Sequence, residues 1–441
     1  MSYAAAIAQL TALVPELHVR AGQPRRKFSL DEVRVLLEGL GDPQRRFPSV
    51  LIAGTNGKGS TASTLASILG EAGLRTGLYT SPHLERPNER IRVDGAEIGD
   101  EAFGRLFFKV DAKAEELCRN GRLPQRPSYF EVLTAMGFLH FAESAVEIAV
   151  LEVGMGGRLD ATNVVEPLLS VITDISLDHT EWLGPTIAAI AREKAGILRR
   201  NGTLITLPQH PEANAVLGEV AVELGVRGVN AAEYIPSRAS RGDYTVQALA
   251  EEVKVHSPLI GPHQQRNVAL AIAAAVELAK RHGFAIPPQA IEAGIERTRW
   301  PGRLERIEQD GIAWVLDVAH NPAGAWALRA GLGAILEDRA PKVLVFSCLR
   351  DKPLAEMAQI LFPLFDQVIV APIQSPRASA MEDLLAAARA TGRVAMPADS
   401  VTAALRLARA QAAGGVVVVS GSVYLVGEAR GLLVGGKAGN L

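Results

Sequence analysis

Short runs of hydrophobic, β-branched residues alternate with longer stretches of helical periodicity from about Phe47 onward. This alternation is typical of a doubly wound sheet in which most strands are parallel, so the pattern predicts an α/β fold. The first group of predicted strands is Ser49–Ala53, Thr76–Thr80, Glu147–Glu152, Leu168–Thr173 and Thr203–Leu207. The second group is Ala313–Asp317, Lys342–Phe346, Gln367–Ala371, Arg393–Met396 and Val416–Ser420.

The length of the chain indicates two domains. Hydrophobic cores stop growing beyond roughly 250 to 300 residues, and the sequence has 441. The stretch Arg297–Arg303 reads RTRWPGR, follows a predicted helix and contains Pro301 and Gly302. Because proline and glycine interrupt regular structure, we place the linker there. We therefore predict one domain over residues 1–300 and a smaller one over residues 301–441.

Charge and cysteine content narrow the class of protein. The 46 basic and 48 acidic residues nearly cancel, which leaves no overall field to attract nucleic acid or an anionic membrane. Cys118 and Cys348 are too few for a disulfide framework. The N-terminus lacks the basic region and cleavage site of a signal peptide and reads as an amphipathic helix. We expect a cytoplasmic protein that acts on small molecules.

A glycine-rich segment carries the clearest chemical signal. Gly54–Ser60 reads GTNGKGS and lies between the apolar strand SVLIA and a helical run. Glycines let backbone amides approach phosphate oxygens, the helix N-terminus favours an anion, and Lys58 would neutralise the β and γ phosphates. The match to GxxxxGK[ST] is incomplete, because Ile52 replaces its first glycine and Gly59 follows the lysine. The alternative interpretation is a glycine-rich turn with a solvated lysine, but the flanking strand and helix favour nucleotide binding. The residues that we expect to contact the nucleotide are Thr55, Asn56, Gly57, Lys58, Gly59 and Ser60.

Polar residues also follow other predicted strands. Ligands of open α/β sheets gather beyond the carboxyl ends of the strands. Ser81 and Glu152 stand at such ends, and His179 follows a third strand. A hydroxyl, a carboxylate and ATP oxygens would suit Mg²⁺, and an imidazole could serve a second ion. Each residue has an ordinary alternative, since Glu152 could cap a glycine turn and His179 could be a hydrogen-bonded loop residue.

One lysine lies on the apolar face of a predicted helix. Ile187, Ile190, Lys194 and Ile197 recur at spacings of three and four. Buried amines lose their proton easily, and a neutral amine can react with carbon dioxide to give a carbamate that bridges metal ions. The alternative is a lysine whose aliphatic stem is covered while its amine reaches solvent.

These residues, in this order, resemble the folylpolyglutamate synthase and dihydrofolate synthase family, a branch of the Mur ligase superfamily, and within it the bacterial bifunctional type. The resemblance spans nearly the whole chain. The matching motifs are AGTNGKGS (Ala53–Ser60), YTSPHLERPNERIRV (Tyr79–Val93), YFEVLTAMGF (Tyr129–Phe138), LEVGMGGRLDATN (Leu151–Asn163), SLDHTEWLG (Ser176–Gly184), REKAGI (Arg192–Ile197), HQQRNVALA (His263–Ala271), WPGRLE (Trp300–Glu305), LDVAHNP (Leu316–Pro322) and SGSVYLVGE (Ser420–Glu428).

The resemblance implies a P-loop domain with a mostly parallel sheet and a smaller Rossmann-like C-terminal α/β domain. It implies that Lys58 contacts the ATP phosphates and that Ser81 and Glu152 hold one Mg²⁺. His179 would hold a second Mg²⁺ beside a carbamylated Lys194. The other residues that would contact ATP are Asn267, Arg303 and Asp317.

The resemblance also carries substrate residues. Ser128, Phe130 and Asp160 correspond to the family's pterin pocket, where an aromatic face and a carboxylate suit a flat nitrogen heterocycle. His320 and Ser422 stand where the C-terminal domain handles the acyl phosphate and the incoming glutamate, with His320 counted among the catalytic residues. The family also implies a monomer.

The function implied is ATP-dependent ligation of L-glutamate to a folate-type carboxylate through an acyl phosphate. Dihydropteroate, a tetrahydrofolate or both remain open as acids. One alternative is a peptidoglycan-precursor Mur ligase, which would carry a full domain ahead of the loop, whereas 53 residues precede Gly54 here. Another is a nucleotide-driven binding switch that forms no covalent product. A basic segment, His18–Phe28, is either a contributor to acid binding or a solvated loop.

Overall fold

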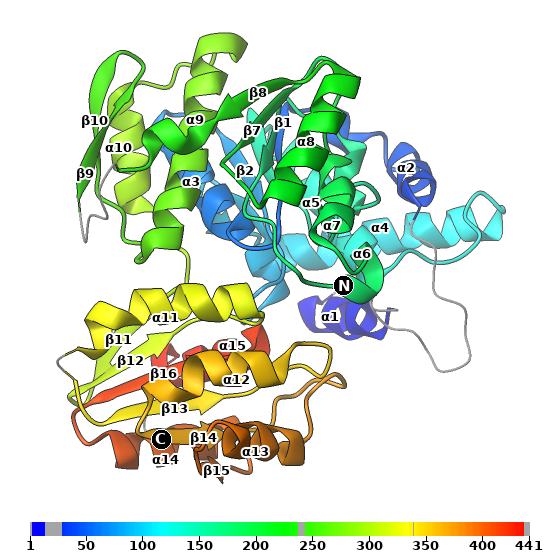
Figure 1. The fold of residues 1–441 in the computed structure, drawn as a ribbon. Coiled ribbons are helices and arrows are strands. Elements are labelled where there is room, and N and C mark those ends of the chain that lie inside the picture. The colour runs from blue at the N-terminus through cyan, green and yellow to red at the C-terminus, as the bar shows by residue number, and fades with distance from the viewer. Residues whose placement is uncertain (1, 14–28, 237–242, 338, 436–441) are drawn as a thin grey trace. The chain divides into compact units, whose positions relative to one another are not determined.

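Two units, each with its own sheet, make up the fold (Figure 1). The computed structural model describes residues 2–13, 29–236, 243–337 and 339–435. Unit 1 comprises Met1–His83, Pro87–Ser257 and Arg266–Thr298, and unit 2 comprises Leu84–Arg86, Pro258–Gln265 and Arg299–Leu441. The basic segment His18–Phe28 lies outside the described residues.

Unit 1 is built on an eight-stranded sheet with the order β4-β3-β2-β5-β1-β6-β7-β8. Strand β3 is antiparallel to β2 and to β4, and all other pairs are parallel. A separate antiparallel hairpin joins β9 to β10. The strands are β1 (Ser49–Ala53), β2 (Thr76–Tyr79), β3 (Ile91–Val93), β4 (Ala96–Glu97), β5 (Ile148–Glu152), β6 (Leu169–Ile172), β7 (Thr203–Thr206), β8 (Arg227–Asn230), β9 (Tyr244–Ala248) and β10 (Glu251–Val255).

Helices cover both faces of this sheet. Successive side chains of a strand point to opposite faces, so Val50 and Ile52 of β1 pack with α3, α9 and α10, whereas Leu51 and Ala53 pack with α4, α5, α7 and α8. The described helices up to residue 298 are α1 (Tyr3–Ala12), α2 (Leu30–Gly39), α3 (Lys58–Glu71), α4 (Asp100–Arg119), α5 (Tyr129–Glu143), α6 (Thr180–Leu183), α7 (Ile187–Ala195), α8 (Pro211–Leu224), α9 (Pro262–His282) and α10 (Pro288–Arg297).

Unit 2 has a six-stranded sheet with the order β11-β12-β16-β13-β14-β15, in which β11 is the antiparallel strand. Val416 and Val418 of β16 pack on the side of α11, α12 and α13, and Val417 and Val419 pack on the side of α14 and α15. Its elements are β11 (Glu305–Gln309), β12 (Ile312–Leu316), α11 (Pro322–Leu336), β13 (Lys342–Phe346), α12 (Leu354–Leu361), β14 (Gln367–Val370), α13 (Met381–Ala390), β15 (Ala395–Pro397), α14 (Val401–Ala412), β16 (Val416–Ser420) and α15 (Val423–Val434).

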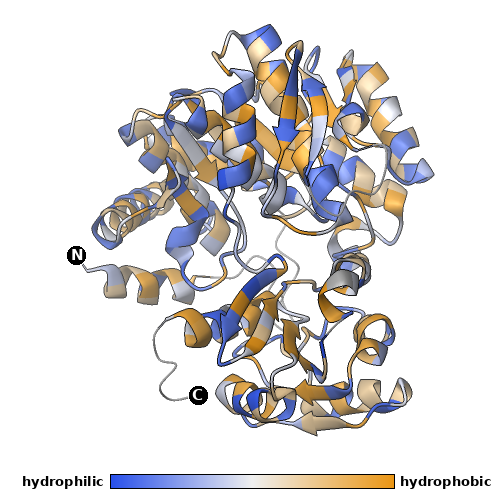
Figure 2. Ribbon diagram, turned by 90° about the vertical axis from the view of Figure 1, so that its left-hand side faces the viewer, coloured by the Kyte–Doolittle hydropathy of each residue, from blue (hydrophilic) through white to orange (hydrophobic). Residues whose placement is uncertain are grey.

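The predicted α/β class and the ten predicted strands are confirmed. Three of these strands have the predicted bounds, and the ends of the other seven differ by one or two residues. Hydrophobic colour gathers on the central strands in Figure 2. Two details are corrected. Helix α3 begins at Lys58, so the second half of Gly54–Ser60 is helical, and Ile197 lies beyond the end of α7. Within the described residues, no helix is long and apolar enough to cross a membrane.

Candidate functional site

Residues 54–57 join β1 to α3 and form the loop that the sequence predicts for phosphate, which we call the phosphate loop. Gly57 has a φ of +89° and is the residue before α3, so a side chain there would be strained. A Cβ atom on Gly57 would also lie 2.1 Å from Asn267 Oδ1. The first amides of a helix have no partner within it, and the helix dipole adds positive potential there. The start of α3, at Lys58, Gly59 and Ser60, is therefore electrostatically favourable for an anion.

Contacts from the segment after β6 hold this loop in shape. The amides of Thr55 and Asn56 donate to the Asp174 carbonyl at 2.8 and 3.2 Å. The Thr173 hydroxyl donates to the Asn56 carbonyl at 2.8 Å. The Lys58 ammonium donates to the Thr55 carbonyl at 3.3 Å, which keeps it over the loop.

Sequence reasoning missed a pair that supports the same loop. Arg266 donates from Nε and Nη2 to the Asp174 carboxylate, with Nη2 2.5 Å from Oδ1. Bidentate arginine–carboxylate pairs fix orientation as well as distance. The sequence did contain a signal, because Asp174 directly follows the predicted strand Leu168–Thr173 and Arg266 lies in the motif HQQRNVALA.

Ser81 and Glu152 meet at the carboxyl ends of β2 and β5. Glu152 is 4% exposed, and its Oε2 accepts a hydrogen bond from the Ser81 amide at 3.0 Å. The Ser81 hydroxyl is buried and has no hydrogen-bond partner. The Ser60 hydroxyl, at the start of α3, is also buried without a hydrogen-bond partner. Unpaired buried hydroxyls are rare, and hydroxyl and carboxylate oxygens are the ligands that Mg²⁺ prefers, so this donor set fits a magnesium ion.

The predicted burial of Lys194 is observed. Its side chain lies in α7, the residue is 3% exposed, and Nζ donates to the Gly54 carbonyl at 2.8 Å. Burial, together with the nearby Lys58, lowers the pKa of Lys194 to about 7, against the opposing influence of Asp178 and Asp160. The amine therefore contacts the first residue of the phosphate loop and loses its proton more easily than an ordinary lysine.

His179 stands at the N-terminus of the short helix α6 with a φ of +50°. Its amide donates to Asp178 Oδ1 at 2.9 Å, and its Nε2 lies 3.9 Å from Asp178 Oδ2. Among the residues that the structure describes, no three His, Cys, Asp or Glu side chains gather to form a metal site by themselves. A metal ion held here would therefore also need ligands of another kind, such as a hydroxyl, a carbamate, water or substrate.

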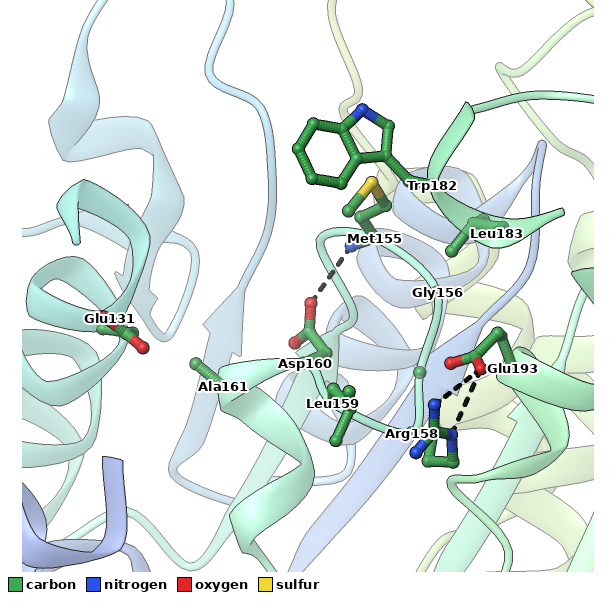
Figure 3. A pocket seen from close by; sticks show the side chains of 11 residues that line it. Glu131, Met155, Gly156, Arg158, Leu159, Asp160, Ala161, Trp182, Leu183 and Glu193 are labelled. Carbon is green, nitrogen blue, oxygen red and sulfur yellow. Dashed lines mark hydrogen bonds and ion pairs between the residues drawn. The ribbon is translucent and has the colours of Figure 1, made fainter. Parts of the chain in front are cut away.

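A pocket of about 120 Å³ opens beside α6 and the segment after β5 (Figure 3). Asp160 is buried in its wall, where Oδ2 accepts hydrogen bonds from the amides of Gly154 and Met155 at 2.9 and 3.0 Å. Burial raises the pKa of Asp160, and these hydrogen bonds oppose the rise. Trp182 and Met155 supply apolar wall beside the carboxylate, which suits a flat polar ring. The lining residues are Glu131, Met155, Gly156, Gly157, Arg158, Leu159, Asp160, Ala161, Trp182, Leu183 and Glu193.

The other two residues predicted for a pterin pocket have structural contacts of their own. Ser128 begins α5 in a reciprocal capping arrangement with Glu131. Phe130 is 4% exposed, and a Cβ atom on Gly154 would lie 2.6 Å from its ring. Neither residue belongs to the lining of the pocket, so of the three predicted side chains Asp160 is the one that reaches it.

The predicted residues of unit 2 lie at the carboxyl ends of the neighbouring strands β12 and β16. Asp317 is buried and accepts hydrogen bonds from the amides of Leu304 and Ala319, both at 2.9 Å. Burial raises the pKa of Asp317, against the influence of Arg303 and His263.

Two more predicted residues of unit 2 lie nearby at the same sheet edge. The ring Nδ1 of His320 lies 2.9 Å from the Val318 carbonyl, so this nitrogen carries a proton. Ser422 caps α15, accepting from the Tyr424 amide at 3.2 Å. The Gly421 amide donates to the Ala319 carbonyl at 3.1 Å, which ties the two strand ends together. Asp317, His320 and Ser422 thus share one edge of this sheet.

Comparison with known proteins identifies both parts of the chain. Residues 52–275 match the family described as Mur ligase middle domain, and residues 302–423 match the Mur ligase glutamate ligase domain. Folylpolyglutamate synthase of Lacticaseibacillus casei is 36% identical over 427 residues, which cover 94% of this chain and 97% of the relative. The dihydrofolate synthase/folylpolyglutamate synthase of Bacillus subtilis is 34% identical, with 92% and 94% covered.

Solved structures agree with these sequence relatives. A Mycobacterium tuberculosis folylpolyglutamate synthase complexed with ADP has a TM-score of 0.88 at 35% identity, over 98% of this chain and 99% of that one. Escherichia coli FolC in complex with DHPP and ADP has a TM-score of 0.84 at 31% identity, over 99% of both chains. The chain therefore belongs to the folylpolyglutamate synthase and dihydrofolate synthase family of Mur ligases.

Proposed function

We propose that this protein joins L-glutamate to the carboxylate of a folate-type acid at the expense of ATP. The observation that carries the proposal is the phosphate loop at the start of α3, with Lys58 over it and the buried Lys194 amine on its first carbonyl. Relatives in complex with ADP, with AMPPCP and with AMPPCP and folate support the choice of ATP and a folate-type acid.

The reaction needs an activation step, because a carboxylate does not react with an amine in neutral water. One carboxylate oxygen attacks the γ-phosphorus of ATP, which gives an acyl phosphate and releases ADP. The glutamate amine then attacks the acyl carbon, loses a proton, and phosphate leaves with the oxygen that came from the acid. Lys58 and the amides at the start of α3 stabilise the charge that develops on the phosphoryl oxygens.

Metal ions belong to the same proposal. Ser81 and Glu152 would hold one Mg²⁺, which the unpartnered Ser81 hydroxyl beside the buried Glu152 carboxylate supports. His179 and a carbamate formed on Lys194 would hold the second, which the burial of the Lys194 amine supports. When bound, magnesium neutralises phosphate charge and polarises the phosphoryl group.

The remaining residue assignments follow the family. We assign Asp160, with Ser128 and Phe130 behind it, to recognition of the pterin ring, and Asn267, Arg303 and Asp317 to ATP. His320 and Ser422 are assigned to the acyl phosphate and the incoming glutamate. We also propose a cytoplasmic monomer, as the resemblance to the family implies. The near-neutral charge supports the absence of nucleic-acid and membrane partners.

A phosphate-release assay tests the proposed function. Purified protein is incubated with Mg²⁺-ATP and either dihydropteroate or tetrahydrofolate, with and without L-glutamate. Released phosphate is measured, and the masses of the products are determined by mass spectrometry. We expect sustained phosphate release only when acid and glutamate are both present, together with a product whose mass equals acid plus glutamate minus water. Phosphate release that ignores both substrates would instead indicate a nucleotide switch, and a peptidoglycan-precursor ligase would leave both pterin acids unchanged.

A further inference from the structure

The segment that carries Asp160 lies directly on the backbone of α7. We call residues 154–160 the glycine turn. The Arg158 amide donates to the Glu193 carbonyl at 2.8 Å, and the Arg158 guanidinium donates to the Glu193 carboxylate at 2.8 and 3.2 Å (Figure 3). A Cβ atom on Gly157 would lie 2.8 Å from the Glu193 carbonyl oxygen and 3.0 Å from that of Lys194. Because these are backbone atoms, the close approach requires glycine at position 157.

A second set of contacts fastens the same two segments just beyond α7. A Cβ atom on Gly196 would lie 2.3 Å from the Cβ of Arg158. The Asn163 side-chain amide donates to the carbonyl of Arg158 at 3.1 Å and to that of Gly196 at 3.0 Å. The glycine turn and the C-terminal end of α7 are thus joined on both sides of Lys194, so a shift of one segment alone would break these hydrogen bonds.

The joined segments reach both halves of the site. At one end Asp160 lines the pocket and is held by the amides of Gly154 and Met155. At the other end Lys194 Nζ donates to the Gly54 carbonyl, at the first residue of the phosphate loop. The path from the pocket carboxylate to the phosphate loop runs through the glycine turn, its contacts with the backbone of α7, and the buried Lys194 side chain.

We propose that the glycine turn and α7 form a rigid bridge that sets the distance between the acid pocket and the phosphate loop, with Gly157 and Arg158 as positioning residues. This inference rests on the proposed function, since it places the acid at Asp160 and ATP at the loop. Transfer of a phosphoryl group requires the two reacting atoms within a few tenths of an ångström of their working separation, and misplacement by about 1 Å can lower the rate about a hundredfold. A bridge of backbone contacts is suited to hold that separation.

The substitution Gly157→Ala tests the bridge. The new methyl group meets two backbone carbonyls and pushes the glycine turn away from α7, while leaving each half of the site with its own residues. We expect kcat to fall about tenfold to thirtyfold while KM for ATP, which binds away from the pocket that Gly157 lines, changes less than about twofold. Gly70→Ala is the matched control, because a Cβ atom there meets nothing within 4 Å, and its kinetics should equal those of the wild type.

The substitution Arg158→Met provides a second test that does not depend on how Gly157→Ala folds. It removes the ion pair to Glu193 and keeps the aliphatic stem beside Gly196. Since the side chains of this pair are 54% and 25% exposed, we expect a smaller loss in kcat, about threefold to fivefold, again without a matching change in KM for ATP. Arg192→Met removes a comparable pair, to Glu219, from the same helix and should leave kcat unchanged.

The outcomes separate the bridge from the function on which it rests. The wild type is measured first, and failure to ligate glutamate to any folate-type acid would overturn the proposed function and the bridge together. With an active wild type, a Gly157→Ala enzyme with wild-type kcat overturns the bridge alone. So does a rise in KM at constant kcat, or an Arg158→Met enzyme that behaves like Arg192→Met.

Discussion

Glutamate-dependent phosphate release is expected to fall at least about a hundredfold when Lys58 is replaced by alanine, because a positioned charge on the developing phosphoryl oxygens is lost. The residue stands at the first position of α3, where its ammonium lies over the loop and donates to the Thr55 carbonyl. Its side chain is half-buried and does not belong to either hydrophobic cluster of unit 1, so the protein should stay folded. Phosphate release with acid and glutamate measures the first effect, and thermal unfolding measures the second.

A matched control for this substitution is Lys109→Ala. The Lys109 amine pairs with Glu143 at 3.0 Å on the surface of α4 and α5, and removing such a pair changes stability by at most about 1 kcal/mol. The control should keep wild-type activity. A Lys58→Ala enzyme with more than half of the wild-type rate would contradict the role of the loop as the ATP phosphate site.

Replacement of Lys194 by methionine is expected to lower the rate of ligation at least about a hundredfold, as for Lys58→Ala. Methionine has nearly the same volume and is flexible enough to fill the buried space in α7, so packing should be retained. What is lost is the amine that contacts Gly54 and, in the proposal, the carbamate that holds the second metal ion. Unfolding midpoints equal to or above that of the wild type are expected, because a buried amine is costly to keep in the folded state.

Carbon dioxide separates the two roles of Lys194. Carbamate forms when the neutral amine attacks carbon dioxide and loses a proton, so wild-type protein kept in carbon dioxide-free buffer should lose activity and regain it with bicarbonate. The Lys194→Met variant should not respond. If the activity of the wild type does not depend on bicarbonate, the proposed carbamate is contradicted. If the Lys194→Met variant is fully active, Lys194 has no role in the mechanism.

The strands that could be predicted are those buried on both faces. Ser49–Ala53, Lys342–Phe346 and Val416–Ser420 were predicted to the residue, since central parallel strands read as continuous apolar runs. The strands that were missed are short or alternate with charge. β11 reads ERIEQ with no fully buried residue, and β8 reads RGVN, so neither produces an apolar run.

Site features that depend on neighbouring residues in the sequence could be predicted, and those that depend on distant residues could not. The phosphate loop could be predicted because its strand, glycines, lysine and helix are contiguous. The apolar spacing around Lys194 predicted its burial, whereas its partner, the Gly54 carbonyl, lies 140 residues away and no local pattern points to it. Phe130 was assigned to a pocket wall, and the close approach of Gly154 to its ring depends on how α5 packs after folding.

The transfer of oxygen from the acid to phosphate tests the central claim most directly. The acid is prepared with both carboxylate oxygens as ¹⁸O, ligation is run in unlabelled water with Mg²⁺-ATP and glutamate, and the released phosphate is analysed by mass spectrometry. Activation at the phosphate loop through an acyl phosphate predicts one ¹⁸O atom in each phosphate released. Phosphate that carries no label, alongside a ligated product, would contradict it.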